Sequence, residues 1–549
     1  MKLEVDNLVK SNTWDLIKKP IINTNIIKGR WVLNKKLNLD NTIKKYKARW
    51  VAKGFLQQYN INYRETFAST SKPSIIRLLL AIFCYLDWEI YTWDVKQAFP
   101  NAELDNNNTL VELPIGLEEH ILNEALKTIT DKALIRYIRN IIATRDYKNI
   151  VCRLNKALYG LKQASRQWQL FLTSILKELD FTPLRIDNSI YIHNNNPILL
   201  ATHVDDLLVF AKTRNLIDDL YKEISKISRL EITNLGEIKE FLGVEIIRDR
   251  SKKSIIITQR SFTRNILYKY NKLLNKPKSI PIAIGTKLTK NFEQSNNNLI
   301  KDFQKQIGSL IYLTIFTRPD LVFSVNYLAR FMSNPSLEHY RYLDNIFSYL
   351  NKTKNYGLNL TLQSKSQDYI DKTINLIGIS DSDWGGDLDS RRSTSGNIFI
   401  LQNNLNNRDN RNIAISWISK LQKVVAISSA EAEYISLKEA TKESLYLNNF
   451  LKELFSFNSI NSISNIFNIT NIIKTDSQSA IELAKNPIYH ARTKHVDITY
   501  HIVRENLQEQ KISLVYENTK TILADILTKP TSKEKFNNFI SRINLVSTI

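Results

Sequence analysis

The stretch ILLATHVDDLLVFAK, residues 198 to 212, constrains the fold more than any other part of the chain. Two apolar runs flank Asp205 and Asp206, a pattern that predicts two short strands joined by a tight turn. Acidic residues are ordinary at a hairpin tip, so the pair has a purely structural interpretation. Adjacent carboxylates also repel each other unless a divalent cation binds them. The hairpin alone leaves a polar turn and a metal site both open.

A third carboxylate is expected beside this hairpin. The stretch WEIYTWDVKQAF, residues 88 to 99, alternates like a strand that ends in Asp94. If this strand pairs beside the hairpin, Asp94 joins Asp205 and Asp206 at neighbouring strand ends. Three such carboxylates suit two-metal phosphoryl transfer, in which one ion activates an attacking 3′-hydroxyl and the other neutralises the leaving pyrophosphate.

The length and net charge of the chain indicate a multidomain protein with a polyanionic partner. A chain of 549 residues is too long for one hydrophobic core and predicts about three or four domains. Its 76 Lys and Arg against 54 Asp and Glu give a net charge of +22, spread along the chain. Dispersed excess charge predicts basic surfaces on folded domains, for which nucleic acid is the first partner and a merely solvated basic surface the alternative.

Cysteines and apolar runs restrict the location. Cys84 and Cys152 are the only cysteines, which leaves no disulfide framework and no cysteine-based zinc site and favours a reducing compartment. The first residues, MKLEVDNLVK, carry charges where a signal peptide needs an apolar run. No apolar stretch approaches the roughly 20 residues that span a bilayer. We therefore expect an intracellular protein without a membrane partner.

After about residue 366 the pattern predicts an α/β domain. Three strands are followed by a long helix, a strand, a helix, a strand and a last helix, which indicates an antiparallel meander that feeds a crossover. Acidic residues fall at element ends or in a helix: Asp381 is expected after the first strand, Glu433 in the first helix, Asp476 after the fourth strand and Asp525 at the start of the last helix. Asp383 and Glu431 are close neighbours, so the residues alone leave the choice among these acids open.

Several motifs, in chain order, resemble the polymerase body of a copia-type LTR retrotransposon, a reverse transcriptase: WDVKQAF, KALYGLKQASRQW, HVDDLLVF and FLGVEI. The stretch YKARWVAKGF resembles the fingers motif of that family, and IGSLIYLTIFTRPDLVFSVNYLARFMSNPSLEH resembles its connection segment. Its RNase H domain is similar to SDSDWGGDLDSRRSTSG, ISSAEAEY, TDSQSAIELAKNP, HARTKHVDI and ADILTKP. The resemblance covers nearly the whole chain and favours the metal-site interpretation of the hairpin.

The resemblance implies a multidomain fold of the α+β and α/β classes, with the right-hand polymerase shape. Residues 1–230 would form the fingers and palm, 231–294 the thumb, 295–365 the connection and 366–549 an RNase H-like domain. The Asn-rich stretch SNNNLIKDF, residues 295 to 303, is expected to be the linker that follows the polymerase body.

Residue roles follow from the same resemblance. The polymerase triad would be Asp94, Asp205 and Asp206. Phe99 would crowd the sugar 2′-carbon, with an ordinary core phenylalanine as the alternative. Lys47 and Arg49 would hold the triphosphate, although a solvated basic strand explains them too. Gln163 would lie near the incoming nucleotide, and FLGVEI, residues 241 to 246, is either a primer grip or a packed turn.

The four-acid RNase H pattern of the family matches Asp381, Glu433, Asp476 and Asp525, and its spacing favours Asp381 and Glu433 over their neighbours. Each active site would hold two Mg²⁺ ions, with Mn²⁺ as the alternative, and in the second site the ions would activate water against the RNA phosphodiester. His490, His495 and Asp497 lie in the HARTKHVDI signature, and structural roles suit them as well as catalytic ones.

The implied function is to copy retroelement RNA into DNA and to cleave the RNA of the resulting hybrid. Its partners would be an RNA template, a DNA primer or primer RNA, the RNA–DNA hybrid and deoxynucleoside triphosphates, in a cytoplasmic retroelement particle or the nucleus. The alternatives are a catalytically decayed nucleic-acid-binding remnant and a host nuclease that uses only the C-terminal domain. Acids at all seven expected positions argue against decay, and the equally complete polymerase motifs argue against a nuclease alone.

The chain also departs from the family pattern. His203 stands where the family has Tyr, and Pro100 and Ala102 occur in FPNAEL, where the family usually has a Gly. We find no Asp-Thr/Ser-Gly protease motif, zinc knuckle or His/Cys integrase finger in the sequence. The expectation is therefore the terminal part of a polyprotein or a truncated genomic copy.

Overall fold

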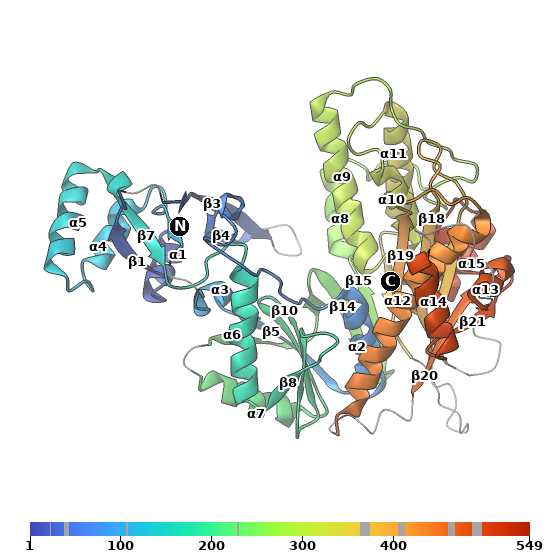
Figure 1. Ribbon diagram of the computed structural model, residues 1–549, viewed down its shortest axis with the longest axis horizontal. Helices are drawn as coiled ribbons and strands as arrows, with labels where there is room; N and C mark the ends of the chain where they lie inside the picture. The colour runs from blue at the N-terminus through green and yellow to red at the C-terminus, as the bar shows by residue number, and fades with distance from the viewer. Residues whose placement is uncertain are drawn as a thin grey trace. The chain divides into compact units, whose positions relative to one another are not determined.

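The computed structural model describes the chain except residues 22–23, 38–42, 106–107, 228–229, 363–373, 404–411, 459, 461–466, 486–496 and 549. The described chain forms two compact units that interleave in sequence. The first comprises Met1–Thr70, Tyr91–Val209 and Arg214–Gly236, and the second Ser71–Ile90, Phe210–Thr213 and Glu237–Ile549. Both contain helices and strands (Figure 1), which confirms the mixed α and β multidomain class. Among the described helices, none is both long enough and apolar enough to span a bilayer.

A six-stranded sheet forms the centre of the first unit. Its order is β12 (Ile232–Glu237), β5 (Glu89–Val95), β11 (Asp206–Ala211), β10 (Ile198–His203), β9 (Ile190–His193) and β8 (Phe181–Pro183). Helices α6 (Ala164–Glu178) and α7 (Arg214–Ser225) accompany it. The predicted hairpin is therefore confirmed as β10 and β11, and the predicted strand pairs beside it as β5. Apolar runs around the turn located the two hairpin strands, and alternation of apolar residues located β5.

The rest of the first unit contains a hairpin and a smaller sheet. Strands β3 (Gly29–Leu37) and β4 (Ile43–Ala52) pair antiparallel. The four-stranded sheet has the order β1 (Trp14–Lys18), β7 (Ile150–Leu154), β6 (Leu110–Val111) and β2 (Ile26–Ile27). The helices are α1 (Lys2–Lys10), α3 (Ala98–Asn101), α4 (Glu118–Ala125) and α5 (Lys132–Thr144).

A five-stranded mixed sheet positions the acidic residues of the second unit. Its order is β19 (Ile413–Leu421), β18 (Thr394–Asn403), β17 (Ile374–Ser382), β20 (Phe467–Thr475) and β21 (Ser513–Tyr516). The first three strands are antiparallel, whereas β20 runs parallel to β17 and to β21. Parallel neighbours need crossovers, and these contain α12 (Ser429–Ser456), α13 (Gln478–Lys485) and α14 (Asp497–Gln508). The predicted run of three strands, a long helix and a strand is confirmed, but two helices, not one, precede β21, and strand β22 (Leu545–Ser547) follows the last helix. The predicted boundary at residue 366 lies outside the described residues.

Helix α2 (Pro73–Tyr85) also belongs to the second unit. Pro73 begins this helix, where its fixed φ suits the first turn, and the apolar residues of the helix are buried. The Nε atom of Arg77 donates a 2.6 Å hydrogen bond to the carbonyl of Ile415 in β19, and its guanidinium lies 3.8 Å from the Trp417 ring centre. Burial lowers the pKa of Arg77 to about 9. A segment far from β19 in the sequence thus completes the packing of that strand.

The second unit contains another five-stranded sheet and five further helices. The sheet has the order β13 (Glu240–Phe241), β14 (Val244–Asp249), β15 (Ser254–Thr258), β16 (Tyr356–Asn359) and β22 (Leu545–Ser547). The helices are α8 (Arg260–Lys269), α9 (Asn297–Phe316), α10 (Val322–Ala329), α11 (Leu337–Lys352) and α15 (Lys533–Arg542). The linker predicted at residues 295–303 is wrong, because this stretch begins α9. Asn296 caps that helix by accepting a hydrogen bond from the Asn298 amide, so the asparagines start a helix and do not interrupt one.

Candidate active sites

The structure brings the three predicted acids of the first unit to neighbouring strand ends. Asp94 lies near the end of β5, Asp206 begins β11, and Asp205 lies in the two-residue turn between β10 and β11. The Val95 amide donates a 2.9 Å hydrogen bond to the carbonyl of Asp205, which fixes β5 beside the turn. All three acidic side chains are half-buried, so solvent and solutes reach them.

The turn that carries Asp205 is strained. Val204 has φ = +59°, a conformation that β-branched residues rarely adopt. A positive φ at the first residue of a two-residue hairpin turn normally selects Gly. The indole N–H of Trp168, from α6, donates a 2.6 Å hydrogen bond to the Val204 carbonyl. Trp168, which the sequence analysis did not single out, therefore holds this turn in place.

An aromatic contact joins two of the predicted nucleotide-binding residues. Phe99 in α3 is half-buried and meets Tyr159 edge to face, with ring centres 5.3 Å apart. The guanidinium of Arg49 lies 5.1 Å from the same Tyr159 ring. Burial raises the pKa of Tyr159 to about 12; Arg49 opposes this shift, while Glu4 and Asp205 add to it. Tyr159, which the sequence analysis missed, thus links Phe99 and Arg49 to the acidic turn.

The two predicted triphosphate ligands face a carboxylate. Lys47 and Arg49 are two residues apart on β4, so they share one face of the strand. Burial raises the pKa of Glu4 in α1, and Arg49 and then Lys47 oppose that shift. The Glu4 Oε1 atom is buried and accepts no hydrogen bond from the described residues. The cationic pair therefore already attracts an anionic group of the chain itself.

Gln163 is buried and makes its hydrogen bonds within the protein. Its Oε1 atom accepts from Gln57 Nε2, and its Nε2 atom donates to the Asn62 carbonyl, both at 2.9 Å. The residue also lines a cavity of about 390 Å³ together with Tyr63 and Asp105. The observed role of Gln163 is to position the segment around residues 57 to 62 at the wall of this cavity.

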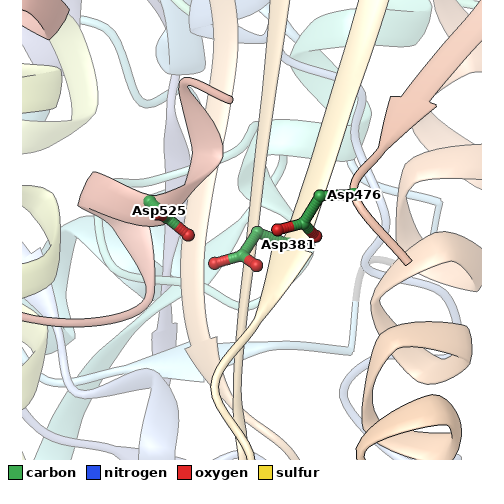
Figure 2. A group of neighbouring side chains, drawn as sticks. All are labelled: Asp381, Asp476 and Asp525. Carbon is green, nitrogen blue, oxygen red and sulfur yellow. The ribbon is translucent and has the colours of Figure 1, made fainter. Parts of the chain in front are cut away.

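Acidic side chains converge more tightly in the second unit. Asp381 lies near the end of β17, Asp476 directly follows the neighbouring parallel strand β20, and Asp525 lies in the 3₁₀ turn Ala524–Leu527. One carboxylate oxygen from each of these residues lies within 4.8 Å of the others. Figure 2 shows the three carboxylates gathered at this point. Among the described residues, this is the acidic group whose carboxylate oxygens lie within 4.8 Å of one another. The side chains of Asp94, Asp205 and Asp206 lie on neighbouring strand ends but do not reach that spacing.

Glu433 in α12 adds a fourth carboxylate. Its Oε1 atom accepts a 3.1 Å hydrogen bond from the Ser382 amide. Its Oε2 atom is buried and has no hydrogen-bond partner among the described residues. Burial raises the pKa of Glu433 well above its usual value, and the charges of Asp381 and Asp476 raise it further. An unpartnered buried carboxylate oxygen beside two other acids suits a cation.

Two lysines balance part of this negative charge. The Lys529 Nζ atom lies 2.8 Å from Asp525 Oδ1 and 3.8 Å from Asp381 Oδ2, and Lys535 also pairs with Asp525. Burial raises the pKa of Asp381 to about 8, although Lys529 opposes this shift. Burial acts in the same direction on Asp525, but the lysines outweigh it and keep the pKa of that carboxyl below its usual value. The site therefore combines a buried acid that resists ionisation with one that is already paired.

The neighbouring acids have other observed partners. Glu431 accepts a 2.7 Å hydrogen bond from the Ile427 amide at the start of α12, where Ser428 caps the helix. Asp383 accepts a hydrogen bond from the Thr394 amide. Capping and turn contacts thus account for Glu431 and Asp383, and the geometry groups Asp381 and Glu433 with the other acids.

One prediction for this region is wrong, and three other predicted residues lie wholly or partly outside the described part of the chain. Asp525 does not enter the last helix as expected, because the 3₁₀ turn ends before Pro530 and α15 begins only at Lys533. His490 and His495 lie outside the described residues. Asp497 begins α14, but its side chain is outside the described part of the chain.

Comparison with known proteins adds a family to this geometry. Residues 11–135 and 136–284 match the family model described as reverse transcriptase (RNA-dependent DNA polymerase). The chain belongs to the reverse transcriptase family. The matched region contains Asp94, Asp205 and Asp206, whereas the acidic cluster of the second unit lies beyond it.

Three curated relatives of this reverse transcriptase chain are retrotransposon polyproteins. The retrovirus-related Pol polyprotein from transposon TNT 1-94 of Nicotiana tabacum is 34% identical over 98% of the chain. Those from transposons RE1 and RE2 of Arabidopsis thaliana are 32% and 31% identical over 99% and 100% of it. The chain spans about a third of their lengths, namely 37%, 33% and 34%. These matches confirm the predicted resemblance to copia-type retrotransposon polyproteins.

Proposed function

We propose that this chain is an RNA-directed DNA polymerase that copies retroelement RNA into DNA and cleaves the RNA of the hybrid. One observation carries the proposal: Asp94 on β5 lies beside the Asp205–Asp206 turn, within the region that matches the reverse transcriptase family. The half-buried carboxylates at this strand edge are accessible to a nucleotide and a primer end.

In DNA synthesis, Asp94, Asp205 and Asp206 would hold two divalent cations, for which Mg²⁺ is the first choice and Mn²⁺ the alternative. Bound there, the cations supply activation of the primer 3′-hydroxyl and neutralisation of the leaving pyrophosphate. Lys47 and Arg49 would hold the triphosphate through charge-assisted hydrogen bonds.

Sugar selection is assigned to Phe99. Its ring is held edge to face by Tyr159, and the guanidinium of Arg49 also contacts the Tyr159 ring. A fixed aromatic ring can exclude a 2′-hydroxyl by its bulk, which favours deoxynucleotides over ribonucleotides. Gln163 contributes indirectly, because its hydrogen bonds to residues 57 and 62 shape the wall of the adjacent cavity.

Cleavage of the RNA strand is assigned to the second unit. The acids concerned are Asp381, Glu433, Asp476 and Asp525. Their oxygens fit a pair of divalent cations, because three carboxylates converge within 4.8 Å and Glu433 Oε2 is buried without a partner. When bound, such cations supply the activation of water against a phosphodiester. Lys529 and Lys535 keep Asp525 ionised.

The proposal retains the domain organisation of the family. Residues 1–230 form the fingers and palm, 231–294 the thumb, 295–365 the connection and 366–549 the RNase H-like domain. The FLGVEI stretch, residues 241 to 246, contains a turn that is packed by a 2.5 Å hydrogen bond from the Tyr312 hydroxyl to the Leu242 carbonyl. A primer grip at this turn requires that the packed loop present its outer edge to the primer strand.

The test is primer extension by the purified chain on an RNA template, with deoxynucleoside triphosphates and Mg²⁺ or Mn²⁺. DNA synthesis together with RNA shortening, both abolished by chelation of the metal, supports the proposal. Template binding without either product would identify a decayed nucleic-acid-binding remnant. RNA cleavage without DNA synthesis would identify a nuclease.

A further inference from the structure

Four apolar side chains are exposed together beside the acidic cluster of the second unit. We call Trp384, Val424, Val425 and Ile427 the apolar patch; their exposed fractions are 61%, 56%, 51% and 77%. Trp384 follows Asp381 by three residues, and Ile427 lies just before the helix that carries Glu433. The two segments that carry the patch are thus each close in sequence to one acid of the proposed nuclease site, Asp381 or Glu433.

Hydrogen bonds join the two segments that form the patch. The indole N–H of Trp384 donates to the Ala426 carbonyl at 3.2 Å. The backbone amide of Gln422 donates to the Ser393 carbonyl at 2.8 Å. This bond joins the end of the segment 384–393 to the start of the segment 422–427. Because the only polar group of the indole is already used, the exposed part of Trp384 is an apolar ring surface.

Side chains of the second unit hold both segments in place. Arg330, which follows α10, pairs with Asp387 at 3.0 Å and donates to the Thr394 hydroxyl at 2.9 Å, so it holds the segment after Trp384. The Ile427 amide is held by Glu431 at 2.7 Å. An exposed apolar surface on preorganised loops loses little conformational entropy when it binds, which favours a recognition role.

The charges around the patch indicate its partner. Exposed cations on the same two segments are Arg391, Arg392, Lys420 and Lys423. Within the described part of the chain, none of these four has a carboxylate within ion-pairing distance. A second copy of this strongly basic chain would bring like charges together at this surface, whereas a polyanion would neutralise them.

We propose that the apolar patch binds the RNA–DNA hybrid, with its side chains against sugars and base edges and the four flanking cations on phosphates. This inference rests on the proposed nuclease function and adds the surface that seats its substrate. Apolar and aromatic contacts combined with backbone cations bind nucleic acid without reading its sequence, as a nuclease that trims a whole transcript requires.

The first test compares Trp384→Ala with wild type in cleavage of a short blunt RNA–DNA hybrid. Loss of one aromatic contact should raise KM about tenfold while kcat changes little. Primer extension should remain intact, because the metal ligands are untouched. Leu337→Ala is the matched control, since Leu337 is a 72% exposed apolar residue of the same unit. An unchanged KM for Trp384→Ala would overturn the proposal, as would a fall in kcat alone.

A second test locates the partner directly and does not depend on turnover. The two native cysteines are buried, so a thiol-reactive photo-crosslinker reports on Val424→Cys, with Leu337→Cys as the control. Label on Val424→Cys should crosslink to the hybrid much more strongly than label on Leu337→Cys. Crosslinks between two protein chains would instead identify a second copy as the occupant. Hybrid cleavage by wild type without these crosslinks would reject the patch and leave the nuclease function standing, whereas no cleavage by wild type would reject the function itself.

Discussion

The two acidic sites of this chain expose their carboxylates to very different degrees. In the first unit, half-buried acids lie at a strained turn, where Val204 adopts φ = +59°. In the second unit, Asp381 and Asp525 are only 1% and 2% exposed, whereas Asp476 is half-buried. Burial makes the charges of the first two acids costly. One site therefore stores backbone strain and the other stores buried charge.

This difference has consequences for chemistry. An open site admits a bulky primer end and nucleotide, but it depends on supports such as Trp168 to keep its acids in place. The more buried cluster of the second unit is preorganised, and the partly exposed Lys529 and Lys535 keep its Asp525 ionised. We expect variants of the first site to change activity strongly, and variants of the second to change stability and pH dependence as well.

The largest effect is expected for Asp205→Asn. Loss of one charge from a site that acts only through bound cations should reduce DNA synthesis by at least about a hundredfold. Primer extension on an RNA template measures this. The control is Asp219→Asn, because Asp219 is an exposed acid of the same unit that pairs only locally with Lys222. Near-normal primer extension by Asp205→Asn would show that the acids of the first unit are not the site of DNA synthesis.

Phe99→Ala should lower the preference for deoxynucleotides by about tenfold or more, since removal of the ring leaves space for a 2′-hydroxyl. The ratio of kcat/KM for a deoxynucleotide and its ribonucleotide provides the measurement. Phe99→Leu, which keeps much of the bulk, should preserve most of the preference. If both variants keep the wild-type ratio, Phe99 is a packing residue against Tyr159 and nothing more.

Asp381→Asn should stabilise the metal-free second unit. Burial raises the pKa of Asp381 from 3.8 to about 8, so between these values the folded chain keeps a proton that the unfolded chain releases. The free energy of unfolding therefore falls as pH rises from about 4 to 8. Removal of this acid should flatten that slope and raise Tm at pH 8 by about 2–4 °C.

Thermal unfolding across this pH range, with the metal chelated, measures the effect. Glu482→Gln is the control, because Glu482 is an exposed acid on α13 and its loss should leave the slope unchanged. Added divalent cation should stabilise wild type more than Asp381→Asn. A lower Tm for Asp381→Asn than for wild type at pH 8 would show that the buried carboxylate does not destabilise the folded chain.

The smallest effect is expected for Val204→Gly. Glycine accepts the positive φ without strain, so the free energy of unfolding should rise by up to about 1 kcal/mol. DNA synthesis should fall less than in Asp205→Asn, because the metal ligands remain. Lys253→Gly, at an exposed turn residue with φ = +46°, is the control for a general effect of glycine. Destabilisation by Val204→Gly alone would contradict stored strain at the turn.

Elements with a strong hydrophobic period could be predicted from the sequence. The β10–β11 hairpin, β5 and the strand order around Asp381 follow from alternation and from apolar runs between turn residues. The same alternation indicated the strand that carries Asp94, and its pairing beside the hairpin was a hypothesis that the sheet order confirms. The linker at residues 295–303 was wrong because asparagine also caps helices, and composition alone does not distinguish a cap from a loop.

Contacts between segments far apart in sequence could not be predicted in this way. Tyr159 meets Phe99 and Arg49 only after the chain has folded, and Arg77 reaches β19 across more than half of the sequence. Lys529 follows Asp525 by four residues, a spacing that suggests a local ion pair, but its approach to Asp381 depends on the sheet. Periodicity reports which residues are buried, not which of them meet.

The separation of the two sites is tested most directly by primer extension and hybrid cleavage, assayed together on single preparations of Asp205→Asn and Asp476→Asn. Asp205→Asn should lose DNA synthesis and keep RNA cleavage, whereas Asp476→Asn should lose RNA cleavage and keep synthesis, because the two acids belong to different carboxylate groups. Loss of both activities in either variant would contradict two separate sites, and so would retention of RNA cleavage by Asp476→Asn.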